Sequence, residues 1–72
     1  MEEYVERVLD VTQLFTDEKI QLQERLILAG AARVDYPFMT GRAEIWVKES
    51  VSQAQVEAWF DVFLEENLIQ LS

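Results

Sequence analysis

The chain has 72 residues, half of them hydrophobic, and a formal net charge of -8 at pH 7, so it allows one folded domain with a small core. It contains no cysteine and no histidine, which excludes disulfides and, in effect, a structural zinc site. An acidic surface of this kind repels nucleic acid phosphates and anionic lipids and attracts basic surfaces.

The first predicted element is a helix over residues 3–14. The apolar residues of this segment recur at three- and four-residue spacing, as the buried face of a helix requires: Tyr4, Val8, Val11 and Phe15. Acidic residues at its start favour the same assignment, because negative charge in the first turn interacts favourably with the helix dipole.

A second helix is predicted over residues 17–29. Thr16 is a suitable N-cap, and Phe15 and Ile20 are spaced to form a hydrophobic staple across the helix start. Gly30 is a suitable stop, because glycine adopts the left-handed conformation that commonly ends a helix.

Residues 32–48 predict a β-hairpin, because apolar and polar residues alternate on both sides of Thr40 and Gly41. A two-residue loop there, or a four-residue loop over 39–42, collects the apolar residues on one face by the same pairs: Val34 with Val47, Tyr36 with Ile45 and Phe38 with Ala43. Pro37 cannot donate a backbone hydrogen bond, so the first strand is expected to lie at a sheet edge or to bend there.

A last helix is predicted over residues 53–66. Ser52 and Gln55 have the spacing of a capping box, and Ser50 with Gln53 is an alternative start. The expected buried stripe consists of Val56, Trp59, Phe60, Phe63 and Leu64. Asn67 is a suitable helix stop, after which residues 68–71 would form a short strand or a packed tail.

Together these elements predict a small α+β domain spanning residues 1–72, with two N-terminal helices, a hairpin and a C-terminal helix. The helix–helix–hairpin part is similar in layout to the core of a winged-helix domain, whose wing is two-stranded. That resemblance would imply nucleic acid binding through the helix at 17–29 and the wing. The helix carries more acidic than basic residues, and Asp35 and Glu44 are interleaved among the basic residues of the hairpin, which favours cross-strand ion pairing over nucleic acid contact.

The sequence predicts no enzyme, no metal site and no cofactor. A histidine, a cysteine and a glycine-rich loop are absent, and Ser50 and Ser52 are better explained as helix caps than as nucleophiles. A cytoplasmic location is expected, because no apolar run approaches the length of a membrane span and the acidic start is unlike a signal peptide.

Trp46 is a candidate partner-binding residue. In the expected register it points away from the apolar face of the hairpin, and a solvent-facing tryptophan often anchors an interface. The alternative is that it packs over the aliphatic part of an arginine or lysine side chain, or under the C-terminal tail.

An acidic stripe in the last helix is the other candidate surface. Glu57, Asp61 and Glu65 recur every fourth residue, and residues 49–72 contain no basic residue. Like charges at this spacing cost about 0.2–0.5 kcal/mol per pair, so the stripe is locally unfavourable. It serves either solubility or the attraction of a basic partner.

Three hypotheses follow for function. The first is a non-enzymatic interaction module, such as a regulator or inhibitor, that docks on a basic protein surface or imitates nucleic acid. The second is a homo-oligomer, such as a homodimer, that associates through Trp46 and the hairpin edge. The third is a winged-helix nucleic acid binder, which the negative charge disfavours.

Overall fold

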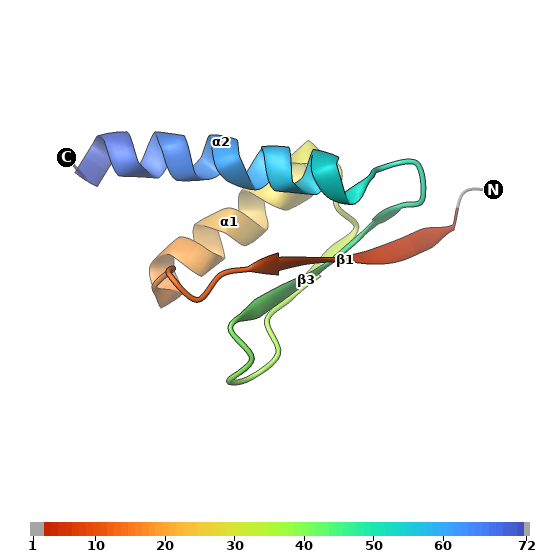
Figure 1. Ribbon diagram of the computed structural model, residues 1–72, viewed down its shortest axis with the longest axis horizontal. Helices are drawn as coiled ribbons and strands as arrows, with labels where there is room; N and C mark the ends of the chain where they lie inside the picture. Colours follow the sequence, from red (N-terminus) through yellow and green to blue (C-terminus); the bar gives the residue numbers. More distant parts are fainter. Residues whose placement is uncertain (1–2, 72) are drawn as a thin grey trace.

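The computed structural model describes the backbone of residues 3–71 and the side chains of residues 3–67. The described chain forms a small α+β domain with two helices and one three-stranded antiparallel sheet (Figure 1). Its elements follow in the order β1 (Tyr4–Asp10), α1 (Thr16–Ala29), β2 (Arg33–Asp35), β3 (Arg42–Lys48) and α2 (Gln53–Leu71).

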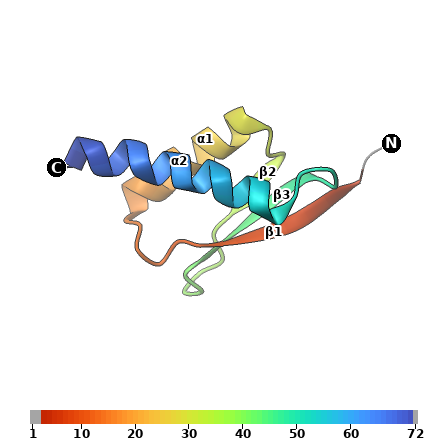
Figure 2. The same cartoon turned by 45° about the horizontal axis from the view of Figure 1, so that its top comes forward.

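The sheet has the strand order β1-β3-β2, and β3 pairs antiparallel with both of its neighbours. The chain therefore leaves β1, crosses the sheet through α1 and returns as β2 on the far side of β3. Both helices lie on one face of the sheet, and the other face has no covering element in the described chain (Figures 1 and 2). The core lies between the helices and the sheet, where Ala43, Ile45 and Val47 of β3 are fully buried.

The segment predicted as the first helix is a strand, so the expectation of two N-terminal helices was wrong. In β1, Val5, Arg7 and Leu9 face the core side, while Tyr4 and Val8 point to the open face. The segment carries both a four-residue and a two-residue apolar spacing. The structure uses the two-residue spacing of a strand. Because β1 pairs with β3 along its full length, alternate side chains of β1 face the core, and Leu9 is buried there.

This correction also removes the winged-helix layout, because from residue 3 onward, where the structure is described, a single helix precedes the strands β2 and β3. The helix expected to recognise nucleic acid, α1, instead packs on the sheet and against α2. Its buried residues Leu22 and Leu26 face the core.

The helix α1 spans Thr16–Ala29, close to the predicted bounds, but it starts differently. Phe15 is the N-cap and makes no side-chain cap bond, and its N–H donates to the Glu18 carboxylate at 2.9 Å. Because Phe15 is itself the N-cap, Phe15 and Ile20 do not occupy the N′ and N4 positions of the expected staple, and their side chains are 78% and 54% exposed. Gly30 ends the helix with a φ of 130°, and its N–H donates to the carbonyls of the last turn.

The predicted hairpin faces agree with the structure, but the predicted register does not. Val34 pairs with Ile45 rather than with Val47, so β2 is shifted by two residues and both apolar residues still face the core. The strand β2 ends at Asp35 and lies at the sheet edge, as Pro37 predicted. Phe38 does not pair with Ala43: it stands at the loop tip and is 90% exposed.

Tyr36 leaves the strand register and reaches back to α1. Its hydroxyl donates a hydrogen bond to the Lys19 carbonyl at 2.6 Å. The partial burial that this contact brings raises the pKa of Tyr36 to about 12. Tyr36 thus joins the end of β2 to the first turns of the crossover helix.

The last helix is longer than predicted. Ser52 accepts a hydrogen bond from the Gln55 N–H at 3.1 Å, in agreement with the predicted cap. Asn67 does not end the helix, because α2 continues to Leu71, and the strand expected at residues 68–71 was wrong. The alternative of a packed tail concerns side chains that lie outside the described ones. Neither helix in the described chain combines the length and apolar character that a membrane crossing needs.

Candidate protein-binding surface

The acidic residues of α2 lie to one side of its buried face. Val56, Phe60 and Phe63 pack into the core, and this fixes the rotation of the helix. The carboxylates of Glu57, Asp61 and Glu65, here called the acidic face, are consequently all exposed. Within residues 3–67, whose side chains are described, none of the three forms an ion pair.

The N-terminal end of the acidic face adjoins strand β1. Glu57 lines an open hollow of about 540 Å³ together with residues of β1, the following turn and the hairpin loop: Val8, Asp10, Thr12, Thr40, Gly41 and Arg42. Two carboxylates, those of Glu57 and Asp10, and one guanidinium, that of Arg42, therefore line the hollow. Its net charge is negative, like that of the acidic face it extends.

Asp10 is held in its charged form by local hydrogen bonds. The backbone N–H of Thr12 donates to the Asp10 carboxylate at 3.0 Å, and the Thr12 hydroxyl donates at 2.8 Å. These two bonds, with a smaller contribution from the nearby charge of Arg42, hold the pKa of Asp10 below its usual value. The carboxylate thus remains ionised down to a lower pH than an ordinary aspartate.

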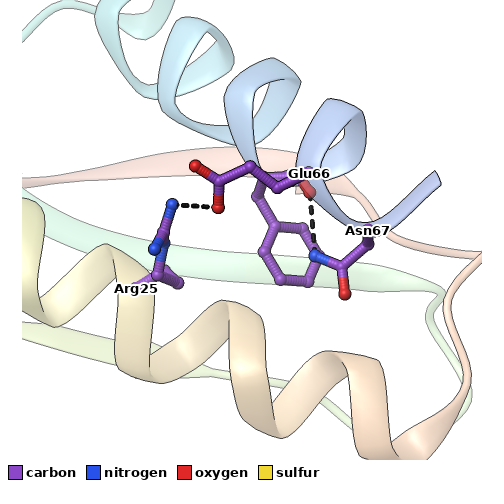
Figure 3. A network of polar contacts seen from close by, with 4 residues as sticks. Arg25, Glu66 and Asn67 are labelled. Atoms are coloured by element: carbon purple, nitrogen blue, oxygen red, sulfur yellow. Dashed lines mark hydrogen bonds and ion pairs between the residues drawn. The ribbon is translucent and has the colours of Figure 1, made fainter. Parts of the chain in front are cut away.

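The opposite side of α2 is neutralised by α1. Arg25 of α1 forms an ion pair with Glu66, and the Asn67 amide donates to the Phe63 carbonyl at 2.8 Å (Figure 3). From the sequence, Glu66 belongs to a segment without basic residues. Its partner Arg25 could not be predicted from that segment, because Arg25 lies in α1. Because this ion pair is exposed, it contributes little to stability. It does compensate the negative charge of Glu66, whereas the negative charges of the acidic face have no such partner in the described chain.

Trp46 is not near the acidic face. In the sheet it lies between Glu6 of β1 and Arg33 of β2, and these residues share the open face that the helices do not cover. It is half-buried among its neighbours on that face rather than packed on the core. The structure therefore separates the four predicted partner-binding residues into two surfaces, with Trp46 on one side of the sheet and α2 on the other.

The charged residues of the hairpin pair differently from the expectation. Arg33 Nε contacts Asp35 Oδ2 at 2.8 Å, which is a pair along strand β2 rather than across strands. Because Arg33 is thereby engaged, the open sheet face offers mixed rather than basic charge, which does not favour phosphate binding.

Sequence reasoning missed one apolar surface and one polar contact. Phe38 and Met39 project from the hairpin loop and are among the most exposed apolar residues of the described chain. Gln53, interpreted only as a capping residue, bonds through its side chain to the backbone of β1. No local pattern signals either feature, because both depend on how distant segments meet.

Among the residues that the structure describes, no group of three or more Asp and Glu side chains is placed to hold a metal ion. No protein-family model matches the chain, and no curated protein and no solved structure is similar enough to match it. The function is therefore inferred from the geometry of this chain alone.

Proposed function

We propose that the protein is a small, non-enzymatic interaction module that docks on a basic surface of a partner protein through the acidic face of α2. One observation carries the proposal: Glu57, Asp61 and Glu65 are exposed on a single side of the helix without an ion pair in the described chain. The neighbouring Asp10 extends this negative surface onto the sheet.

The spacing of the acidic face suits a groove that accepts regularly spaced negative charges. Carboxylates at successive helix turns lie ~6 Å apart, which resembles the spacing of phosphates along a nucleic acid strand. A regulator or inhibitor of a nucleic-acid-binding protein can use such a row to occupy the basic groove in place of nucleic acid. The partner class that fits best is thus a protein with a row of lysines and arginines.

Reversing the charge of the acidic face tests this proposal. The double variant Glu57→Lys with Asp61→Lys is expected to abolish capture of the partner from lysate of the native host, because the contact then repels a basic surface. The fold should be retained with a stability within about 0.5 kcal/mol of the parent, because both side chains are exposed. Quantitative mass spectrometry of captured proteins and thermal unfolding give the two readouts.

A matched control separates the acidic face from net charge. Glu24→Lys with Glu49→Lys makes the same change in total charge at exposed positions outside the acidic face, in α1 and in the connection before α2, and it should leave capture largely intact. If both double variants lose the partner equally, the effect is one of total charge and the acidic face is not the contact. Unchanged capture by the α2 variant contradicts the proposal directly.

The open sheet face supports a second candidate, self-association. Trp46 shares this face with Tyr4 and Val8, which are 53% and 38% exposed, so an aromatic and aliphatic patch lies uncovered in the described chain. Light scattering would then give twice the monomer mass, and Trp46→Ser would return the protein to a monomer. A wild-type monomer at millimolar concentration contradicts this candidate.

A further inference from the structure

The free edge of strand β1 has backbone groups that point away from the sheet. Pairs in antiparallel strands alternate between those that exchange hydrogen bonds and those that do not. The Glu49 N–H donates to the Glu3 carbonyl at 2.8 Å, and the Val11 N–H donates to the Gly41 carbonyl at 2.9 Å. Odd-numbered residues of β1 therefore bond toward β3, and the even-numbered ones direct their N–H and C=O to the free edge: Tyr4, Glu6, Val8 and Asp10.

A side-chain amide already occupies part of this edge. The Gln53 amide nitrogen donates to the Val8 carbonyl at 2.7 Å, and the Val8 N–H points to the Gln53 amide oxygen at 3.4 Å. These are the two bonds that one residue of an added antiparallel strand would make with Val8 through its own N–H and C=O. The contact shows that the edge is accessible and that it takes an amide with donor and acceptor side by side.

The charges around the edge select the kind of strand. An added strand would place alternate side chains on the open face, beside Glu6 and Asp10, and on the helix side, beside Glu57. Carboxylates thus border both of its faces. A second copy of this chain is disfavoured there, because it would bring two acidic helices together, whereas lysines and arginines would meet these carboxylates with opposite charge.

We propose that the free edge of β1 is a strand-addition site that binds an extended partner segment carrying Lys or Arg at alternate positions. The inference rests on the proposed function, because it states the form in which the basic partner is bound. Backbone hydrogen bonds to Tyr4, Glu6 and Val8 would supply affinity, and the carboxylates would supply the preference for basic side chains. The incoming strand displaces the Gln53 amide from Val8.

The test uses the full chain and an eight-residue peptide of alternating lysine and threonine as the probe. Binding is measured by NMR titration, and hydrogen exchange is measured at individual amides. The edge amides of Tyr4 and Glu6 should exchange at least about tenfold more slowly when the peptide is bound, because they acquire acceptors. Binding without added protection of these two amides overturns the strand-addition site.

Two substitutions, Glu6→Pro and Gln53→Ala, are expected to change peptide binding in opposite directions, and Glu6→Thr is the control for the first. Glu6→Pro removes an outward N–H, and at an edge strand this leaves the sheet bonds in place, so peptide binding should weaken about tenfold or more. Glu6→Thr removes the same charge but keeps the N–H, and it should weaken binding clearly less. Gln53→Ala removes the competing amide, and binding should tighten by about three- to tenfold.

The variants also separate this inference from the proposed function. If Glu57→Lys with Asp61→Lys abolishes binding while Glu6→Pro and Gln53→Ala leave it unchanged, the acidic face binds the peptide and the edge does not. A wild-type protein that fails to bind the peptide overturns strand addition, whereas capture of the partner tests the acidic face independently. If Glu6→Pro does not fold, the affinity of Gln53→Ala for the peptide and the exchange rates of the Tyr4 and Glu6 amides still test the strand-addition site.

Discussion

Replacing Ile45 by alanine is expected to lower the free energy of unfolding by about 2–5 kcal/mol, because the loss of buried apolar area leaves a cavity. Ile45 is fully buried at the centre of the middle strand, and it pairs with Arg7 on one side and Val34 on the other. A 72-residue domain has a total stability of roughly 4–11 kcal/mol. The variant should therefore melt at least about 10 °C lower, as measured by circular dichroism.

The same substitution at Ile27 of α1 is the matched control. Ile27 is 47% exposed, so truncation there removes less buried area, and alanine is a better helix former. Its cost should lie below about 1 kcal/mol. Equal losses at the two positions would contradict the placement of β3 at the centre of the core.

Replacing Gly41 by alanine is expected to cost about 2–4 kcal/mol through two separate effects. Gly41 has a φ of 68°, which a residue with a Cβ adopts only at a steric cost. An alanine Cβ would also overlap the Thr12 Cγ2 atom, in a turn where the Val11 N–H is bonded to the Gly41 carbonyl. Chemical denaturation of the variant measures the sum of both effects.

A double-mutant cycle with Thr12→Ser separates the two costs. Serine keeps the hydroxyl that donates to Asp10 but lacks the Cγ2 atom that the new Cβ would meet. In that background Gly41→Ala should retain only the backbone cost of about 1–2 kcal/mol. If the cost is unchanged by Thr12→Ser, the steric overlap contributes nothing and the strain is entirely in the backbone.

The fold class was predictable from local patterns, but the first element was not. Val5, Arg7 and Leu9 form the inward row of β1, and a charged residue in the middle of that row hides its alternation. Arg7 is accommodated because its Nε donates to the Val51 carbonyl at 3.1 Å, and Val51 lies in the connection before α2. Since this acceptor belongs to the other end of the chain, the sequence around Arg7 favours a helix by default.

Register and helix length were limited in a similar way. The apolar alternation of the hairpin is satisfied equally well by two pairings that differ by two residues, and in the observed pairing Tyr36 bonds to Lys19 in α1. Asn67 resembles a helix stop by residue type, yet its side chain bonds within α2 to the Phe63 carbonyl. The Tyr36 contact joins residues 17 positions apart, which local spacing does not predict, whereas Asn67 shows that residue type alone does not end a helix.

The acidic face was predictable because its position depends only on how α2 is rotated about its own axis. Trp59, Phe60 and Phe63 define the inward side of α2, so the positions of Glu57, Asp61 and Glu65 follow from helical geometry. Its relation to Trp46 was not predictable, because that depends on which face of the sheet the helices cover. The β1 edge could not be inferred at all while that segment was interpreted as a helix.

The pairing of β1 with β3 has a consequence for the order of folding. Tyr4 pairs with Lys48, whereas β2 and β3 are joined by a short loop. Forming the β1–β3 pair therefore closes a much longer loop of chain than forming the β2–β3 pair. The entropy lost on closing the longer segment favours early formation of the β2–β3 hairpin and late arrival of β1. During synthesis, β1 leaves the ribosome before β3, and Tyr4 can pair only after Lys48 has been made.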